Sequence, residues 1–405
     1  MKDQIFAEIK SLMPEMIKTL SELCAIPAIS PLAGGDGEHR KGEYIIRKLK
    51  ELGFGEPEMY NSPDETATGG ARPNIVVRVP GRTQQRLCIV SHMDVVPEGD
   101  RTLWHTDPFR AVVKDGRIYG RGVNDNCQEL VASLYAAAAL KRLGITPKYG
   151  VCLCFVADEE VGSLHGIQFL LTQHVFKPDD LVIVPDGGSE SGDFIETAEK
   201  SILWAEFTLD GRQVHASTPQ LGINACRTAN EFSVALDSAL HEAFPEEDRL
   251  FDPPVSTFEP TRRAQNVANV NTVPGREVFC FDCRVLPTIP LDKVRAVIDA
   301  VIKKTQDKYK VTITYKLLQN VQAPKPTPAD SPVVDVLKTA LKEVLPVEPK
   351  VGGVGGGTCA AYFRDKGIPA IVWDQEADCA HMPNEYAELA HIENEAKVFA
   401  LMMAG

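Results

Sequence analysis

The sequence predicts an α/β fold in which a larger domain, with a mixed sheet flanked by helices, is interrupted by a smaller inserted α+β sandwich. Two observations lead to this class. Short apolar runs bounded by turn residues alternate with helix-length segments over the first 200 residues, and the pattern changes in character after about residue 200. Continuous apolar runs between helices are typical of strands buried on both faces of a parallel or mixed sheet.

The elements of the larger domain follow from the spacing of apolar residues. An amphipathic helix is expected at the N-terminus, with a break near Pro14, because proline interrupts the helical hydrogen bonds. Further helices fit residues 42–52, 128–143, 163–173 and 333–345, the last opened by Ser331-Pro332. Buried strands are expected at 74–80, 86–92, 151–158, 180–186 and 367–374.

The inserted domain has a strand–helix–strand–strand-like order. Strand-like runs at 201–211, 269–287 and 309–318 are separated by helices expected at 225–244 and 291–308. The proline-rich segment 323–332 is interpreted as the linker that returns the chain to the larger domain. The predicted domains are therefore 1–200 together with 319–405, and 201–318.

Composition excludes several classes of protein. Lys and Arg number 43 against 56 Asp and Glu, a net charge of −13, which disfavours binding to nucleic acid or to an anionic membrane. No apolar run reaches the roughly 18 residues of a membrane span, and the charged N-terminus lacks a signal-peptide core, so a cytoplasmic protein is expected. The 10 cysteines are expected to be free thiols in such a chain.

A thiolate zinc site is not expected. The one CxxC pair, Cys280 and Cys283, lies in a strand-like run, where residues three apart point to opposite faces of the sheet.

Acids and histidines instead gather where the predicted strands end. His92 ends one run, Glu159 and Glu160 follow the next, Asp186 follows a third, and His381 lies one loop after the last. In an open α/β sheet, ligands bind outside the carboxyl ends of the strands. Each residue alone has an ordinary explanation, such as a solvated surface group or a helix cap, but their joint placement predicts one shared crevice.

Asp125, in the glycine-flanked run 119–126, is the fifth candidate ligand. Two imidazoles and three carboxylates suit zinc, cobalt or manganese. Five ligands exceed the needs of one catalytic zinc, whereas two metals bridged by one carboxylate use them all, and Asp125 is the choice for the bridge. Two metals about 3.5–4 Å apart are usual in hydrolytic sites.

The motifs HMDVVP (92–97), GRGVNDN (120–126), ADEEVGS (157–163), PDGG (185–188) and HMPNEY (381–386) resemble those of the zinc aminoacylase/carboxypeptidase family. That family includes succinyl-diaminopimelate desuccinylase, acetylornithine deacetylase, aminoacylases, glutamate carboxypeptidase and the carnosine and Xaa-His dipeptidases. The resemblance spans nearly the whole chain. It implies that 1–200 and 319–405 form a catalytic di-metal domain and that 201–318 form a lid domain through which the protein forms a homodimer.

The resemblance also implies a role for each motif residue. His92 and Asp186 would hold one metal, Glu160 and His381 the other, and Asp125 both. Asp94 would orient the His92 imidazole. Glu159 would be the general base that activates water for attack on an amide carbonyl. His215, on the inserted domain, would reach the active site of the partner subunit and stabilise the oxyanion; its ordinary interpretation is a histidine on a surface loop.

Substrate contacts are expected from three places. Arg284 and Asn271 resemble a pair that binds the substrate carboxylate, with Asn269 competing for the role of Asn271, although Arg284 also fits a plain surface strand residue. Gly356 and Thr358 belong to a loop resembling the family's glycine–threonine loop. No lysine follows these glycines, so the loop is not a phosphate loop.

The chain departs from the commoner family patterns in two respects. Cys127, Cys359 and Cys379 lie beside three of the motifs; core filling explains them, and the alternative is a thiol near the metals that makes activity sensitive to oxidation. Asp186 lies at a position where the desuccinylases and deacetylases of the family usually carry Glu and where the dipeptidases usually carry Asp.

The expected activity is therefore hydrolysis of a dipeptide or N-acyl amino acid. The alternatives are an N-succinyl or N-acetyl amino acid deacylase of lysine or arginine biosynthesis, and a non-catalytic relative that binds a metal or metabolite. The last would have lost Glu159 or a ligand, and the sequence retains all of them.

Overall fold

The computed structural model describes all 405 residues, which form two compact units. Unit 1 comprises Met1–Thr197, Thr327–Gly352 and Thr358–Gly405, and unit 2 comprises Ala198–Pro326 and Gly353–Gly357. Compared with the predicted domains, unit 2 extends further along the chain, to Pro326, and includes a short glycine-rich segment.

The framework of unit 1 is an eight-stranded mixed sheet in the order β1-β2-β6-β3-β7-β16-β8-β15. Strand β3 is parallel to β6 and β7, and β16 is parallel to β7, whereas β1, β2 and β8 pair antiparallel. The strands are β1 (Glu58–Pro63), β2 (Ala71–Val79), β3 (Arg86–His92), β6 (Gly150–Val156), β7 (Leu181–Val184), β8 (Phe194–Glu199), β15 (Lys350–Val354) and β16 (Ala370–Val372). The predicted mixed sheet is confirmed.

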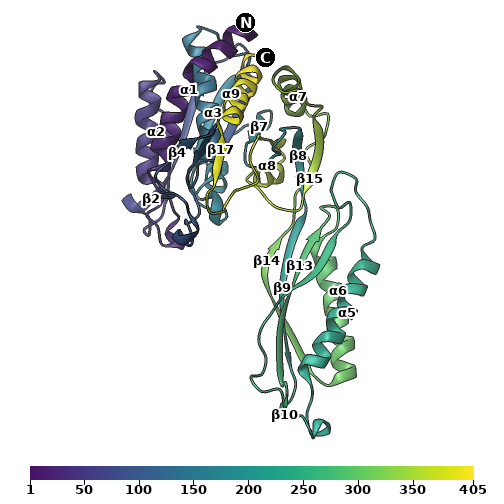
Figure 1. Cartoon of the computed structure of the whole chain (residues 1–405). Helices are drawn as coiled ribbons and strands as arrows, with labels where there is room; N and C mark the ends of the chain where they lie inside the picture. The colour runs from purple at the N-terminus through teal and green to yellow at the C-terminus, as the bar shows by residue number, and fades with distance from the viewer. The chain divides into compact units, whose positions relative to one another are not determined.

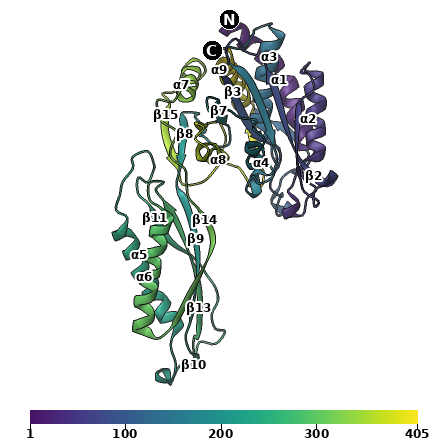
Figure 2. The ribbon, with the colours of Figure 1, turned by 180° about the vertical axis from the view of Figure 1, so that it is seen from behind.

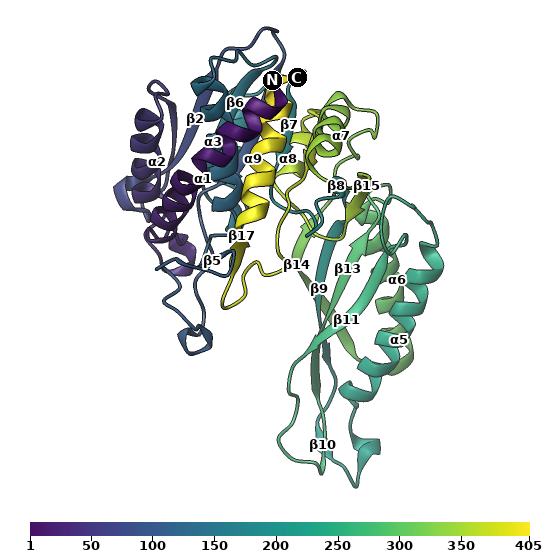
Figure 3. The ribbon, with the colours of Figure 1, turned by 45° about the horizontal axis from the view of Figure 1, so that its top comes forward.

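Both faces of this sheet are covered by helices, because successive strand residues point to opposite sides. In β3, Leu87 and Ile89 pack in one core with α1 (Lys2–Cys24), α2 (His39–Glu51), α3 (Cys127–Arg142), α7 (Pro332–Val344) and α9 (Leu389–Ala404). Cys88 and Val90 pack in a second core with α4 (Ile167–Thr172) and α8 (Ala360–Asp365). Helices α1, α3 and α9 lie side by side (Figures 1 and 3).

The expected break at Pro14 is wrong, since α1 runs without interruption through this residue. Proline within a helix costs about 3 kcal/mol through a lost hydrogen bond and a steric clash. The buried stripe of α1, which includes Ile9, Leu12 and Leu20, packs against α3 and α9 and outweighs that cost. A hydrogen bond of 2.8 Å between the hydroxyls of Thr19 and Tyr135 also ties α1 to α3.

Several elements of unit 1 were not predicted. Helix α9 is buried around most of its circumference and therefore shows no clear polar face in the sequence. A small sheet of β17 (Tyr386–Glu388), β5 (Arg117–Tyr119) and β4 (Val112–Lys114) pairs segments far apart in the chain. Short 3₁₀ helices form at Pro31–Ala33, Thr68–Gly70, Arg101–Leu103 and Glu159–Val161.

Unit 2 is an α+β sandwich. Its antiparallel sheet has the order β11-β13-β9-β14, and helices α5 and α6 lie side by side against it (Figure 2). Its core is rich in phenylalanine, with Phe207 in ring contact with Phe232, Phe279 and Phe281. The elements are β9 (Ser201–Asp210), β10 (Val214–His215), the 3₁₀ helix Pro219–Leu221, α5 (Ala225–Ala243), β11 (Thr257–Arg263), β12 (Thr272–Val273), β13 (Arg276–Val285), α6 (Leu291–Tyr309) and β14 (Thr312–Val321).

None of the helices in the chain combines the length and apolar character that a membrane crossing requires.

Candidate active site

Four neighbouring strands of unit 1 end in candidate ligands. His92 is the last residue of β3, Glu159 and Glu160 begin the 3₁₀ helix after β6, Asp186 lies two residues after β7, and His381 follows β16. In the sheet these strands have the order β6-β3-β7-β16 and all run parallel. Their carboxyl ends therefore share one edge of the sheet, which brings the candidate ligands together.

Asp125 lies between the two histidines. Its Oδ1 is 2.8 Å from Nε2 of His92, and its Oδ2 is 3.1 Å from Nε2 of His381. His381 Nε2 is also 2.9 Å from Oε2 of Glu160, and His92 Nε2 is 3.3 Å from Oδ1 of Asp186. One carboxylate thus faces both imidazoles, each of which has a second acid beside it.

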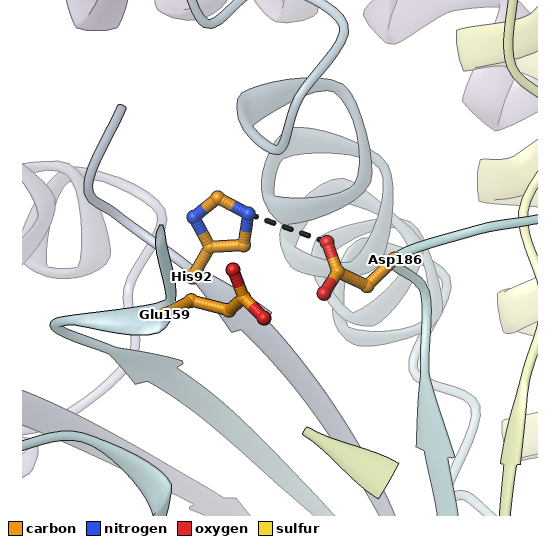
Figure 4. A group of neighbouring side chains, drawn as sticks. All are labelled: His92, Glu159 and Asp186. Carbon is orange, nitrogen blue, oxygen red and sulfur yellow. Dashed lines mark ion pairs between the residues drawn. The ribbon is translucent and has the colours of Figure 1, made fainter. Parts of the chain in front are cut away.

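These side chains form two compact sets of metal-ligating atoms. His92, Glu159 and Asp186 form one set, and His92, Asp125 and Glu160 the other, with the ligating atoms of each set within 4.8 Å of one another. Figure 4 shows His92 beside Asp186 with the Glu159 carboxylate close to both. One oxygen of Glu160 is buried and has no hydrogen-bond partner. Imidazole and carboxylate donors at this spacing fit divalent zinc, cobalt or manganese.

The charges of this cluster perturb one another strongly. Burial alone would lower the pKa of His92, but the Asp186 and Asp125 carboxylates raise it well above its ordinary value. Hydrogen bonds to Asp125 and Glu160 raise the pKa of His381 to about 10. Burial, reinforced by the charge of Asp186, raises the pKa of Glu159 well above that of an ordinary glutamate. Such perturbed groups gathered at one edge are typical of a catalytic site.

Asp94 contacts the candidate ligands through its main-chain oxygen and through its carboxylate. Its main-chain oxygen is 3.0 Å from Nδ1 of His92, and its carboxylate Oδ1 is 3.5 Å from the same nitrogen. The carboxylate also accepts the main-chain N–H groups of Glu159 at 3.0 Å and Glu160 at 3.1 Å. Asp94 therefore contacts both the imidazole and the turn that carries the two glutamates.

Two further residues hold the candidate ligands, and sequence reasoning gave neither a role. Asn126 accepts the N–H of His92 at 3.1 Å and donates to Oδ1 of Asp186 at 3.4 Å. Glu385 is fully buried, accepts the N–H of Asp125 at 3.2 Å and pairs with buried Arg121 at 2.5 Å. Both lie inside motifs quoted above, but only the tertiary contacts distinguish them from their neighbours.

The three cysteines beside the motifs are all buried. Cys127 accepts a hydrogen bond from the buried Lys41 ammonium at 3.7 Å, and Cys379 accepts the N–H of Tyr386 at 3.4 Å. Cys359 lies 3.2 Å from the Ser163 hydroxyl and 4.0 Å from Oε1 of Glu159. Burial raises the pKa of all three thiols, which opposes thiolate reactivity.

The predicted substrate contacts, except Thr358, belong to unit 2. His215 is exposed on β10, with its Nδ1 2.7 Å from the Ser217 hydroxyl. The main-chain oxygen of Asn271 accepts the N–H of Ala216 at 2.8 Å, and that of Asn269 accepts the N–H of Thr272 at 3.2 Å.

Arg284 is held by residues of its own unit. Its guanidinium donates to both carboxylate oxygens of Asp282, at 2.7 and 3.0 Å, and to the main-chain oxygen of Gly355 at 2.6 Å. Gly356 is exposed in the same short segment, with open space where a Cβ would stand. Thr358 belongs to unit 1, and its hydroxyl accepts the N–H of Ala360 at 3.2 Å.

Comparisons with known proteins identify the family of the chain. Residues 88–405 match the model of peptidase family M20/M25/M40. The chain is 41% identical to an uncharacterized metallohydrolase of Methanocaldococcus jannaschii, covering 96% of this chain and 98% of the relative. It is 26% identical to the succinyl-diaminopimelate desuccinylase of Nitrosomonas europaea, covering 89% of this chain and 91% of that protein.

Solved structures share the fold. The aminopeptidase PepT of Bacillus cereus has a TM-score of 0.76 at 19% identity, covering 97% of this chain and 98% of that one. Human carnosine dipeptidase 1 has a TM-score of 0.69 at 17% identity, covering 100% and 99%. With the extended family match, these findings show that the chain is a metallohydrolase that belongs to peptidase family M20/M25/M40.

Proposed function

We propose that this protein is a dinuclear zinc-dependent amidohydrolase or exopeptidase. Its substrate would be a dipeptide or an N-acyl amino acid with a free carboxylate. The observation that carries the proposal is the convergence of His92, Asp125, Glu160, Asp186 and His381, with Glu159 beside them, at one edge of the unit 1 sheet.

The contacts support a shared carboxylate. We assign His92 and Asp186 to one metal, Glu160 and His381 to the other, and Asp125 to both, since its two oxygens face different imidazoles. When bound, the two metals would lower the pKa of a water molecule and polarise the amide carbonyl. Asp94 would fix the orientation of the His92 ring and of the turn bearing the glutamates.

Glu159 would transfer the proton. Its carboxylate is grouped with His92 and Asp186, so it lies beside the residues assigned to one metal, where a general base has to be in order to reach the attacking water. Glu159 would accept a proton from the attacking water and then deliver it to the nitrogen of the leaving amine. Glu160, the adjacent residue, pairs with His381 instead.

Unit 2 would complete the site in a homodimer. His215 of one protomer would stabilise the oxyanion in its partner, which its exposure on β10 permits. Arg284 and Asn271 would bind the substrate carboxylate. Gly356 and Thr358 would contact the substrate from the glycine–threonine loop. In this proposal the substrate carboxylate takes the place of Asp282 on the Arg284 fork.

Deacylation is the second candidate. The desuccinylases among the relatives favour it, whereas Asp186 favours a dipeptide. A panel of dipeptides, N-succinyl and N-acetyl amino acids, assayed with Zn²⁺, Co²⁺ or Mn²⁺, separates the two. The proposal fails if metal is bound and no member of the panel is hydrolysed.

Two variants test the assigned roles. Glu159→Gln keeps the shape of the side chain but cannot accept the proton, so turnover should fall by about 10²–10⁴-fold while the metal content stays unchanged. His215→Ala should lower kcat without changing the oligomeric state measured by light scattering. Wild-type activity of His215→Ala would refute the shared site.

A further inference from the structure

Strand β2 carries a buried arginine to which the proposed reaction gives no role. Arg72 is 1% exposed, and its guanidinium faces three carboxylates. Nε and Nη2 donate to the two oxygens of Glu38, which is fully buried directly before α2. Nη1 lies 3.1 Å from Oδ1 of Asp158 and 3.5 Å from Oδ2 of Asp64. The planar donors of an arginine hold such carboxylates in a fixed geometry.

Asp158 connects this arginine to the 3₁₀ helix that bears the candidate general base. It is 2% exposed and comes directly before that helix. Its N–H donates to Oε1 of Glu38 at 3.2 Å, and its main-chain oxygen accepts the N–H of Ser163 at 2.6 Å. Its Oδ2 accepts the N–H of His165 at 2.9 Å, and its Oδ1 faces Arg72. The pair of Arg72 and Glu38 therefore holds both the side chain and the main chain of Asp158.

The backbone of Asp158 is in the left-handed region, with φ at +67°. Residues with a side chain seldom adopt this region, and aspartate does so more readily because its short polar side chain can form local hydrogen bonds. The conformation sets the direction in which the chain leaves β6, and hence where the next two side chains point. Glu159 is grouped with His92, whereas Glu160 lies 2.9 Å from His381.

The positive charge of Arg72 offsets acids that lie against this turn. The buried Asp94 carboxylate already accepts the N–H groups of Glu159 and Glu160, so Asp94 and Asp158 both place negative charge close to the two glutamates. Without Arg72, Asp158 would be a buried charge with no cation beside it, which is unfavourable enough to displace the turn. The turn is thus held at two points, by Asp94 through its N–H groups and by Arg72 through Asp158.

We propose that Arg72 is a positioning residue for the hydrolysis, which acts through Asp158 and Glu38 to fix the directions of Glu159 and Glu160. The inference rests on the proposed function, because the roles of the two glutamates come from it. Arg72 is buried behind the turn, so it neither binds the substrate nor transfers a proton. Its loss should therefore lower kcat and weaken the metal assigned to Glu160, and leave KM nearly unchanged.

Arg72→Lys keeps a buried positive charge but has a single nitrogen, which cannot replace the fork that holds both Glu38 and Asp158. In the full-length, zinc-loaded enzyme, assayed well below its Tm with the best substrate of the hydrolysis panel, kcat should fall by about 10–100-fold. Equilibrium dialysis should show that one of the two zinc ions binds about 10–100-fold more weakly. Hydrogen exchange of peptides spanning residues 157–163 should become faster.

Arg78→Lys is the matched control. It makes the same substitution on the same strand, at an arginine whose guanidinium lies 2.8 Å from Glu58 instead. Its kcat, zinc binding and hydrogen exchange at residues 157–163 should match those of the wild type.

A double-mutant cycle tests whether Arg72 acts through Asp158. Asp158→Asn removes the charge that Arg72 holds and keeps the size of the side chain, so kcat should fall here too. In the double variant Arg72→Lys/Asp158→Asn, the loss of kcat should be no larger than in the more affected single variant, because both substitutions break one contact. Losses that multiply would overturn the inference.

Wild-type kcat, zinc binding and hydrogen exchange in Arg72→Lys would also overturn it. If Arg72→Lys does not fold, Asp158→Asn takes its place in the same measurements, and wild-type values there have the same consequence. Failure of the proposed function has a different signature. A wild type that hydrolyses no member of the panel refutes that function, whereas zinc binding and hydrogen exchange of the variants still decide whether Arg72 fixes the turn.

Discussion

Replacing Asp94 with alanine should destabilise unit 1 and weaken its metal binding together. The Asp94 carboxylate is fully buried and accepts the N–H groups of Glu159 and Glu160 at 3.0 and 3.1 Å. Alanine leaves both donors buried without a partner, at about 1–3 kcal/mol each. The expected loss is therefore about 2–6 kcal/mol in the free energy of unfolding of the metal-free protein.

Asparagine at the same position should cost roughly half as much. Its amide oxygen can still accept one N–H, but its NH₂ group faces the other donor, so one buried N–H remains unpaired at about 1–3 kcal/mol. Loss of support for a ligating histidine typically lowers metal affinity by about 10–100-fold. Both variants should therefore bind zinc more weakly than the wild type.

Urea unfolding of chelated protein, followed by circular dichroism, measures the stability change. Hydrogen exchange of peptides spanning residues 157–163 reports directly on the two N–H groups, which should exchange faster in both variants. Asp330→Ala, at an exposed turn residue, is the control and should match the wild type within about 0.5 kcal/mol. An alanine variant at position 94 with wild-type stability and unchanged exchange at Glu159 and Glu160 would refute the argument.

Two further predictions concern the core and the dependence of stability on pH. Trp373→Ala removes a fully buried ring that packs edge-to-face on Phe399 and donates a hydrogen bond to the main-chain oxygen of Gly192. Chemical unfolding should therefore show a loss of about 3–5 kcal/mol in the free energy of unfolding. A loss below about 1 kcal/mol would contradict this packing. Burial raises the pKa of Glu395 from 4.5 to about 8, so the folded state retains a proton that the unfolded state releases. Its contribution to stability is fully present below about pH 4.5, the ordinary pKa of this group, and is lost as the pH rises through about 8. The Tm of the wild type, measured in chelator between pH 5 and 8.5, should decline as the pH rises, and the decline should be shallower in Glu395→Gln. Equal slopes in the two proteins would contradict this prediction.

Much of the fold could be predicted from local patterns. The run 86–92 coincides with β3, and the helices expected at 225–244 and 291–308 differ from α5 and α6 by one residue at one end. Helix α9 could not be predicted, because a helix that is buried on most sides has no periodic polar face. The continuity of α1 could not be predicted either, because it depends on packing against α3 and α9, which outweighs the penalty of Pro14.

The positions of the candidate ligands followed from the order of the strands. His92, Glu160, Asp186 and His381 lie at or beyond the ends of apolar runs, and parallel strands bring such ends to one edge. The roles of Asn126 and Glu385 could not be recognised in the same way, because a hydrogen bond to the main chain of a distant residue leaves no periodic signal.

The sequence alone determined which residue types stand at the ends of which strands, and hence the family and the class of chemistry, because strand periodicity and motif spacing are local properties. Only the tertiary structure decided that Asp125 faces both imidazoles, that Asp94 holds the turn bearing Glu159, and that three acids from α3, α9 and the segment after β16 are buried together. These arrangements depend on side-chain direction and on packing between segments far apart in the chain, such as those of Gln128 and Glu395, which form a hydrogen bond although they are 267 residues apart. The free energy of such contacts comes from burial and from complementary polar groups, which no local pattern records.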